Sequence, residues 1–300
     1  MIKKKNILIL GVTGFLGFHL AKRVLKLGWN VYGVSKHKPK KYRIISKVKY
    51  LFFDLSKEKK FILLNKYSFD HVVNLSGYAE HKNKTLTNAG HLKTVKNLCN
   101  YFKNRKLKSF IQIGSSDEYG KLNTPYLETQ KCKPSGIYGK SKLKSTTYLI
   151  NQNRFSVTIL RFFLVYGPFQ DLNRFMSQLI VTALKRKKFK TTLGNQCRDF
   201  LYVSDAINAI IKSIMRHRKV KNDIINIGYG KCIRLKKIIQ LVKRETKYLN
   251  PIYGSIPLRK HEPLKNYPNI KKAKKKLNWS PKISLHQGIR KTILFYKSRL

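Results

Sequence analysis

The sequence predicts a doubly wound α/β fold with a parallel sheet, followed by a smaller C-terminal region. In the first half, short and nearly continuous apolar runs alternate with segments whose apolar residues have helical spacing. A glycine-rich loop separates the first apolar run from the first helical segment. After Val165 the alternation becomes irregular. The 300 residues suffice for one large domain or two smaller ones.

The apolar runs of the first half are expected to form strands that are buried on both faces. They are Asn6–Leu10, Asn30–Val34, Tyr50–Phe53, His71–Leu75, Phe110–Ile113 and Val157–Phe163. Between the first two runs, one helical stripe is formed by Leu16, Leu20, Val24 and Leu27, and Gly28 should end that helix. Repeated alternation of strand and helix implies right-handed crossovers between parallel strands.

The second half contains fewer strands and more proline. We expect these elements: a helix over Arg174–Arg186, a strand over Phe200–Val203, a helix capped by Ser204 or Asp205, a strand over Ile224–Ile227, and an amphipathic helix with Ile238, Ile239 and Val242. Loops and short helices should follow. The predicted division is a first domain over residues 1–165 and a second region over 166–300. Elements near 200–228 should return to the first domain.

The chain is strongly basic, with 65 Lys and Arg against 13 Asp and Glu and a formal net charge of +52. Such a charge attracts polyanions, including nucleic acid. The lysines are spread along the whole chain, which favours solvated surfaces over one focused binding patch. A role in binding nucleic acid stays open but is not favoured.

Three further features bear on the compartment of the protein. The longest apolar runs are too short to span a bilayer. The basic start and the following apolar stretch run into the glycine loop without a cleavage-like site, so we expect a cytoplasmic protein. Cys99, Cys132, Cys197 and Cys232 form no CxxC pair, so we expect reduced thiols and neither a disulfide framework nor a metal site.

The loop Gly11–Gly17 has the spacing GxxGxxG between a strand and a helix. Glycine permits a tight turn and lets backbone N–H groups approach a pyrophosphate, which the helix N-terminus also attracts. The loop therefore predicts a dinucleotide site. Its cofactor-binding residues are Gly11, Thr13, Gly14, Phe15, Leu16 and Gly17.

The end of the second strand bears on the choice of dinucleotide. An acidic residue there would bind the ribose of NAD, but the sequence has Ser35, followed by Lys36 and Lys38. This favours NADP, with NAD as the alternative. Asp54, with the adjacent Leu55, is expected to contact the adenine; the structural alternative is that Asp54 caps the next turn.

Tyr138 and Lys142 are four residues apart and would share one face of a helix. A nearby ammonium stabilises phenolate, which predicts a lowered pKa for Tyr138. Such a tyrosine can exchange a proton with a sugar hydroxyl while hydride passes to or from a nicotinamide. Ser115, just after the strand Phe110–Ile113, is placed to hydrogen-bond the same reacting oxygen.

These residues belong to a longer series of motifs. The series consists of the glycine loop, Asn74–Gly77, Gly114–Gly120, the Tyr138/Lys142 pair, Leu160-Arg161 through Val165–Pro168, Arg198–Asp205, Asn226–Gly228, and Lys274–Trp279 with Pro281. In this order they resemble the extended short-chain dehydrogenase/reductase family of nucleotide-sugar epimerases, dehydratases and 4-ketoreductases. The resemblance covers essentially the whole chain and implies a Rossmann-like fold with a smaller C-terminal substrate-binding region.

The resemblance also implies roles for individual residues. Tyr138 would be the acid/base, Lys142 would tune it and hold the nicotinamide ribose, and Ser115 would complete the triad. Contacts with a nucleoside-diphosphate sugar would come from Ser115, Ser116, Asn173, Arg198 and Arg259. Arg198 would grip the diphosphate, and Arg259 is the weaker second candidate. The structural alternatives are a surface charge for either arginine and a helix N-cap for Asn173.

Family members often form homodimers through two helices per subunit. The segments around His91–Phe102 and Tyr138–Asn151 are the candidates in this chain.

Three reactions are compatible with this machinery: 4-epimerisation, 4-keto reduction and 4,6-dehydration. Family dehydratases need an Asp-Glu pair directly after the triad Ser or Thr. Aligned without a gap, that position holds Ser116-Asp117; shifted by one residue, it holds Asp117-Glu118, with Ser116 replacing Ser115. We therefore favour an epimerase or a 4-ketoreductase. A dehydratase and a non-enzymatic RNA-binding member of the fold are the alternatives.

Overall fold

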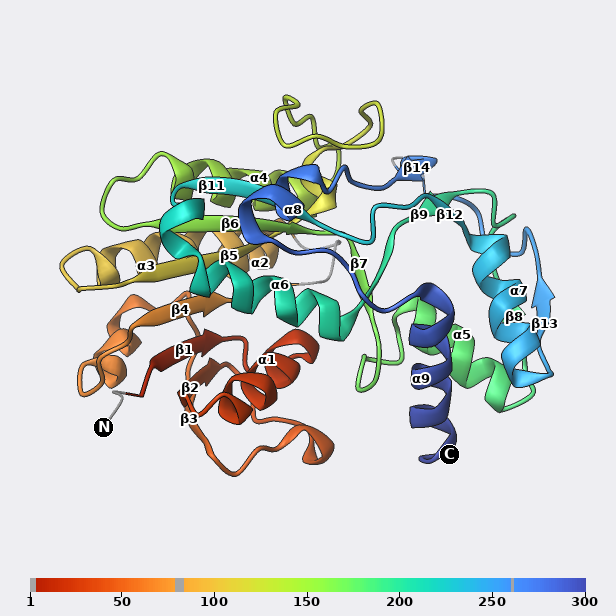
Figure 1. Cartoon of the computed structure of the whole chain (residues 1–300), viewed down its shortest axis with the longest axis horizontal. Coiled ribbons are helices and arrows are strands. Elements are labelled where there is room, and N and C mark those ends of the chain that lie inside the picture. The colour runs from red at the N-terminus through yellow and green to blue at the C-terminus, as the bar shows by residue number, and fades with distance from the viewer. Residues whose placement is uncertain (1–3, 79–83, 260–261) are drawn as a thin grey trace.

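The computed structural model describes residues 4–78, 84–259 and 262–300, and its centre is a seven-stranded parallel sheet (Figure 1). The strands are β1 (Asn6–Leu10), β2 (Asn30–Ser35), β3 (Val48–Phe52), β4 (His71–Asn74), β5 (Ser109–Ser115), β6 (Val157–Phe162) and β11 (Asp223–Ile227). Their spatial order is β11-β6-β5-β4-β1-β2-β3. The chain runs outward from β1 in both directions, so the predicted doubly wound α/β fold is confirmed.

Helices cover both faces of this sheet. They are α1 (Phe15–Lys26), α2 (Lys84–Asn88), α3 (Thr94–Phe102), α4 (Ile137–Ile150) and α6 (Val203–Met215). Short 3-10 turns lie at Lys41–Arg43, Glu58–Leu64, Ser116–Glu118 and His217–Val220, and a π-helical turn spans Ala89–Lys93. Helices α1 and α6 pack on one face, whereas α3 and α4 pack on the other (Figure 1).

Strand β1 shows why its sequence is apolar throughout. Ile7 and Ile9 belong to the core cluster on the side of α1 and α6. Leu8 and Leu10 belong to the cluster on the side of α3 and α4. All four side chains are fully buried, as expected for a strand covered on both faces.

The remaining elements lie mainly beyond the carboxyl end of the sheet, on the right of Figure 1. The strands are β7 (Leu164–Tyr166), β8 (Lys188–Lys190), β9 (Cys197–Arg198), β10 (Phe200–Tyr202), β12 (Ile233–Arg234), β13 (Asn250–Ile252) and β14 (Lys265–Asn266). The helices are α5 (Phe175–Leu184), α7 (Leu235–Thr246), α8 (Lys271–Leu277) and α9 (Leu285–Lys297). Strand β11 returns to pair with β6, while the division at residue 165 stays a prediction.

Two expectations for the second half are wrong in detail. Helix α6 begins at Val203, before both predicted caps, and its N-cap Tyr202 makes no side-chain hydrogen bond. The Asp205 carboxylate instead accepts the backbone N–H groups of Lys282 and Ile283. The C-terminal part also contains a full 13-residue helix, α9, capped by Ser284.

The cysteines are a further correction. Cys197 and Cys232 form a disulfide, with Cα atoms 5.3 Å apart. They are 35 residues apart in sequence, but β9 and β12 are antiparallel neighbours and bring them together. Cys99 and Cys132 are free thiols, as expected.

In the described ranges of the chain, no helix is long and apolar enough to cross a membrane.

One buried ion pair joins β6 to the 3-10 turn that follows β5. Glu118 is fully buried and accepts a hydrogen bond from Nε of Arg161 at 2.9 Å. Its other oxygen accepts the backbone N–H of Ser115 at 2.8 Å, which closes a capping box at the end of β5. The Arg161 guanidinium also lies 4.6 Å from the ring centroid of Tyr119. Burial opposes the charge of Arg161, but Glu118 outweighs it and raises the pKa of the guanidinium.

We expect Glu118→Gln to lower the free energy of unfolding by about 3–5 kcal/mol, because it leaves the buried Arg161 charge without its counter-ion. Urea denaturation followed by circular dichroism would measure the loss. The double variant Glu118→Gln/Arg161→Met removes both charges and should recover part of it.

A matched control is the exposed pair between Lys108 and Asp70, at 2.8 Å. Because Lys108 is solvent-exposed, Lys108→Met should cost no more than about 1 kcal/mol. An equally small loss in Glu118→Gln would show that the buried pair does not stabilise the fold.

Candidate active site

The glycine loop lies at the carboxyl end of β1 and has room only for glycine at its closest approaches. Gly11 has a φ of +79°, and a Cβ at Gly17 would lie 2.2 Å from the carbonyl oxygen of Gly11. The N-cap of α1 is Gly14, which has no side chain that could cap the helix, and the first turn of α1 holds no acidic residue. The N–H groups of this turn are therefore placed to bind an anion, which fits the pyrophosphate of a dinucleotide.

The ends of β2 and β3 flank this loop. Ser35 is buried, and its Oγ accepts the backbone N–H of Thr13 at 3.2 Å. Asp54 accepts the N–H of Ser56 at 2.9 Å, so it does cap the following turn. It also forms an ion pair with Lys36 at 3.2 Å, while the adjacent Leu55 is buried. Phe15 and Leu16 begin α1 and pack partly buried against the core.

The predicted triad assembles beside β5. Ser115 ends β5, and Tyr138 and Lys142 lie four residues apart on α4. The side chains of Ser115 and Tyr138 are hydrogen-bonded. The buried Lys142 donates from Nζ to the carbonyl oxygen of Ile113 at 3.0 Å, and Nζ lies 5.9 Å from the centroid of the Tyr138 ring. The sequence expectation that these three side chains meet agrees with this geometry.

The pKa expectation for Tyr138 is wrong. Burial raises the pKa of Tyr138, and the nearby carboxylates of Asp117 and Glu118 raise it further. The hydrogen bond from Ser115 and the charge of Arg174 act in the opposite direction but do not outweigh burial. Burial also lowers the pKa of Lys142 to about 8, against the opposing pull of Glu118 and Asp117. The lower pKa of Lys142 leaves less positive charge beside Tyr138, where an ammonium would stabilise the phenolate.

The segment after Ser115 bears on the two alignments of the dehydratase pair. Ser115 contacts Tyr138, and Ser116 is buried. Glu118 is held by Arg161 and by the Ser115 N–H, while Asp117 is exposed. Glu118 is thus a structural carboxylate, and the dehydratase alternative is not favoured.

The substrate candidates are spread over several segments. Arg198 is buried at the end of β9, donates to the carbonyl oxygens of Cys197 (2.7 Å) and Leu264 (3.3 Å), and pairs with Glu262. Arg259 and Asn173 are exposed. Asn173 is not the N-cap of α5; that residue is Arg174, which makes no side-chain cap bond.

Sequence reasoning missed two residues near the triad. The charge of Arg174 acts on Tyr138, and the only available signal was its position next to Asn173. His91 is buried with its ring edge-on to that of Tyr138, with centroids 5.3 Å apart. A single histidine between two helical segments carries no motif, so the sequence could not single it out.

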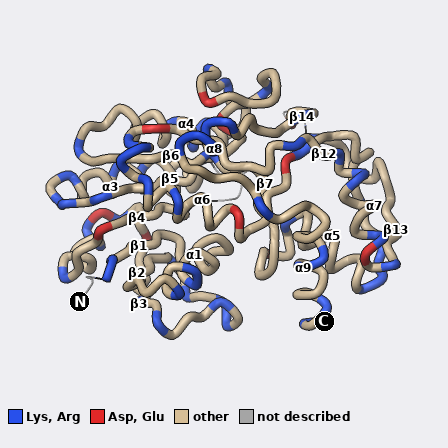
Figure 2. Tube along the Cα trace, in the orientation of Figure 1, with Lys and Arg blue, Asp and Glu red and all other residues tan. Residues whose placement is uncertain are grey.

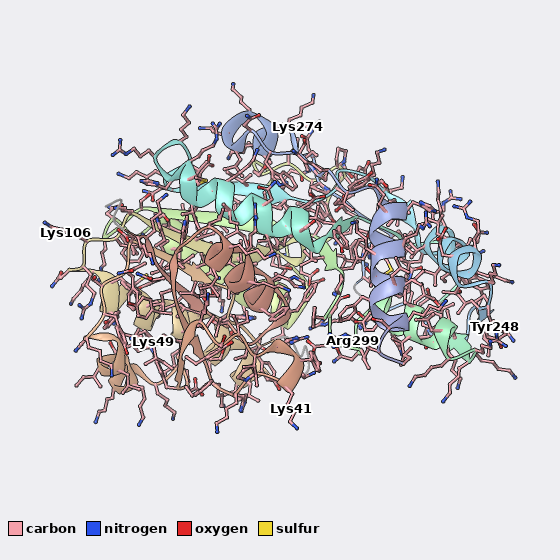
Figure 3. The ribbon with its side chains drawn as sticks, turned by 60° about the horizontal axis from the view of Figure 1, so that its bottom comes forward. Lys41, Lys49, Lys106, Tyr248, Lys274 and Arg299 are labelled. Atoms are coloured by element: carbon pink, nitrogen blue, oxygen red, sulfur yellow. A yellow bond between two sulfur atoms is a disulfide. The ribbon has the colours of Figure 1, made fainter. Side chains whose placement is uncertain are left out.

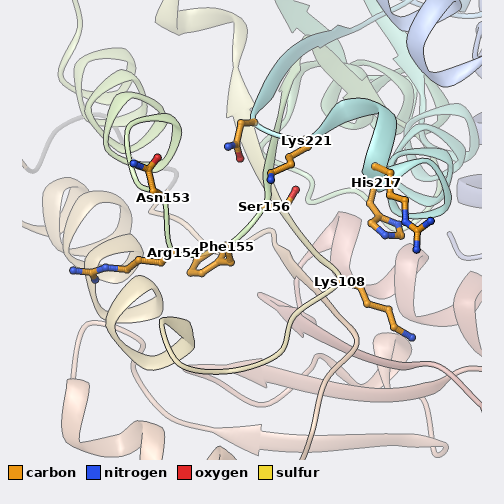
Figure 4. A pocket seen from close by; sticks show the side chains of 9 residues that line it. Lys108, Asn153, Arg154, Phe155, Ser156, His217 and Lys221 are labelled. Carbon is orange, nitrogen blue, oxygen red and sulfur yellow. The ribbon is translucent and has the colours of Figure 1, made fainter.

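One described pocket lies away from the triad. It has a volume of about 410 Å³ and is lined by Lys108, Arg154, Phe155, His217 and Lys221, among others (Figure 4). These residues precede β5, β6 and β11, so the pocket lies at the amino ends of the strands. Ligands of such folds bind at the carboxyl ends, where the glycine loop and the triad lie.

The positive charge is spread over the molecule. Lys and Arg occur along the whole trace in Figure 2, and Lys41, Lys106 and Lys274 project from three distant parts of the surface in Figure 3. This distribution fits solvated lysines, and the RNA-binding alternative is not favoured.

Comparison with known proteins agrees with the geometry. The family model of the NAD dependent epimerase/dehydratase family matches residues 7–228. A UDP-glucuronate 4-epimerase of Thermodesulfobacterium geofontis is 26% identical, over 98% of this chain and 96% of that protein. The crystal structure of a Thermotoga maritima UDP-glucose 4-epimerase with UDP-glucose matches with a TM-score of 0.92 at 24% identity. That match covers 98% of this chain and 99% of the other.

A Bacillus cereus UDP-glucuronic acid 4-epimerase, in complex with UDP-glucuronic acid and NAD, matches with a TM-score of 0.89. It is 24% identical, over 98% of this chain and 100% of the other, and both structural matches confirm the Rossmann-like fold. Because the family model spans well over half of the sequence, the predicted family is confirmed. The chain belongs to the NAD dependent epimerase/dehydratase family and is a nicotinamide-dependent enzyme of nucleotide-sugar chemistry.

Proposed function

We propose that this chain is a 4-epimerase that acts on a UDP sugar. The observation that carries the proposal is the meeting of Ser115, Tyr138 and Lys142 next to a loop shaped for a dinucleotide. The UDP-glucuronate 4-epimerase relative and the two UDP-sugar epimerases of similar fold support UDP as the nucleotide.

Each residue of the triad has a defined task in this proposal. Tyr138 takes the proton of the C4 hydroxyl and later returns it, and Ser115 holds the same oxygen by a hydrogen bond. Lys142 stabilises the phenolate of Tyr138 and binds the nicotinamide ribose. The bound NAD(P) supplies the acceptor and donor of hydride. The glycine loop, through Gly11, Thr13, Gly14, Phe15, Leu16 and Gly17, holds its pyrophosphate, with Asp54 and Leu55 near the adenine.

The same geometry supports a binding mode for the substrate. Arg198 presents a fork of N–H donors that suits a diphosphate, and the contacts to Cys197 and Leu264 hold it in place. Glu262, its present partner, would give way to the phosphate oxygens. Ser116, Asn173 and Arg259 are the further substrate contacts in this proposal.

A 4-ketoreductase is the second candidate, and the end of β2 favours it. Ser35 leaves no carboxylate to repel a 2′-phosphate, and Lys36 and Lys38 are exposed beside it. We propose NADP as the preferred cofactor on this ground. A reductase consumes one NADPH for each product molecule, whereas an epimerase retains its dinucleotide. The two candidates therefore differ in the amount of cofactor consumed per turnover.

We further propose a cytoplasmic homodimer. Helices α3 and α4 would form its interface; they are neighbours, with Nζ of Lys96 on α3 lying 5.8 Å from the Tyr148 ring centroid on α4.

The proposed reaction predicts that Tyr138→Phe abolishes turnover while dinucleotide binding survives. Removing the hydroxyl removes the proton carrier but leaves the glycine loop intact. The assay incubates the protein with a panel of nucleotide sugars and their 4-keto forms, with and without NADPH, followed by chromatography and mass spectrometry. An isomer of unchanged mass identifies epimerisation, gain of two hydrogens identifies reduction, and loss of water identifies dehydration. Full activity in Tyr138→Phe would remove this residue from the mechanism.

The diphosphate role predicts that Arg198→Ala raises the substrate KM by about 10- to 100-fold, since charge-assisted hydrogen bonds contribute about 1.5–3 kcal/mol. Cofactor affinity should change little. UDP binding by calorimetry measures the same loss without turnover, and Arg198→Lys should recover only part of it because it lacks the planar fork. A variant that loses cofactor affinity but keeps its KM would place Arg198 elsewhere.

The cofactor proposal predicts that Ser35→Asp shifts the NADP/NAD affinity ratio toward NAD by at least about tenfold, because a carboxylate would repel the 2′-phosphate. Aspartate still offers an oxygen to the Thr13 N–H, so the loop should keep its shape. Fluorescence titration with both dinucleotides gives the ratio. An unchanged ratio would mean that residue 35 does not read the 2′ position.

A further inference from the structure

We infer that His91 is a positioning residue that holds Tyr138 in its reactive orientation. The inference rests on the proposed function, because it concerns the tyrosine that carries the proton. His91 is buried, and its ring lies edge-on to the Tyr138 ring with centroids 5.3 Å apart.

Hydrogen bonds fix the orientation of the His91 ring at both nitrogens. The backbone N–H of Tyr78 donates to Nε2 at 3.2 Å, so Nε2 carries no proton. The proton of the neutral ring is then on Nδ1, which lies 3.2 Å from Oγ of Ser141. Ser141 in turn donates to the carbonyl oxygen of Thr87 at 3.2 Å. The ring is thereby tied to α4, the helix that carries Tyr138.

The position of Lys142 agrees with a neutral His91. A Cβ placed on Gly77 would lie 2.9 Å from Nε2 of His91 and 3.7 Å from Nζ of Lys142. Both side chains therefore lie close to the same point beside Gly77. A second cation beside the Lys142 ammonium is disfavoured, which leaves His91 as a neutral hydrogen-bonding group.

The backbone around His91 is also irregular. His91 lies in the π-helical turn Ala89–Lys93 between α2 and α3. Such turns are rare and occur frequently at functional sites, where they redirect a side chain. Here the turn coincides with the residue that reaches Tyr138 and Ser141, so the irregularity and the contacts point to the same role.

A purely structural histidine would give similar contacts, and the chain contains a matched example. His71 is buried at the start of β4, and its Nδ1 lies 3.0 Å from Oγ of Ser109. This pair is at the amino end of the sheet, away from the triad. His71→Leu is therefore the control for loss of a buried His–Ser hydrogen bond without an effect on Tyr138.

The experiment compares His91→Leu, His91→Asn, Ser141→Ala and His71→Leu with the wild type. We expect His91→Leu to lower kcat by about 10- to 100-fold, the size expected for a misplaced catalytic group, with the substrate KM and dinucleotide affinity within about twofold. Asparagine can replace one acceptor and one donor of the ring, so His91→Asn should recover part of kcat. Ser141→Ala should act in the same direction, and its effect should not add to that of His91→Leu.

A second measurement does not depend on turnover. Protein labelled with ¹³Cζ-tyrosine gives one NMR signal per ordered tyrosine, and Tyr138→Phe identifies the signal of Tyr138. That signal should move in His91→Leu and in Ser141→Ala but not in His71→Leu. A wild type inactive on every nucleotide sugar would refute the proposed function, and the NMR comparison would still decide the role of His91. Equal loss of kcat in His91→Leu and His71→Leu, or a Tyr138 signal unmoved by both His91→Leu and Ser141→Ala, would overturn the inference.

Discussion

The site depends on one buried ion pair, between Glu118 and Arg161. Glu118 fixes the backbone N–H of Ser115 and so sets the end of β5, where the serine of the triad lies. The other partner, Arg161, lies on β6, and its guanidinium lies over the ring of Tyr119. The Tyr119 hydroxyl donates to the side-chain oxygen of Asn226 on β11 at 2.7 Å. Three neighbouring strands are therefore locked together at their carboxyl ends. A buried pair gives modest net stability, but removing one partner leaves a charge with no compensation, so the arrangement tolerates little change.

The fold could be predicted from the sequence because parallel strands buried on both faces leave a strong local pattern. All six strands of the first half appear, with ends shifted by at most two residues, and Asn6–Leu10 is unchanged. Errors occur where a distant partner decides the local structure. Asp205 is a good helix cap by composition, but Lys282 and Ile283 take its carboxylate. Cys197 and Cys232 look unrelated until β9 and β12 become neighbours.

Only those parts of the site that local sequence motifs encode could be predicted. The glycine loop and the Tyr138–Lys142 spacing are local, and the sheet brings them together as expected. The electrostatics are not local: burial raises the pKa of Tyr138 and lowers that of Lys142 to about 8, and the spacing of residues in the sequence does not reveal burial. His91 depends on a π-helical turn and on contacts to α4. Its role follows from the packing of three segments and not from any one of them.

The small number of carboxylates limits the reactions that the site can catalyse. The chain has only 13 Asp and Glu residues, and two of them, Asp117 and Glu118, act on Tyr138 through their charges. Glu118 is committed to Arg161, and Asp117 is exposed. Elimination of water would need a second acid–base group besides the tyrosine. Transfer of a proton and a hydride at a single carbon does not, because Tyr138 can both take and return the proton. The basic surface does not alter this argument, since its lysines are spread over the molecule while the triad lies at the carboxyl edge of the sheet. The use of Glu118 as a structural anion is therefore what favours reversible chemistry at one carbon over dehydration.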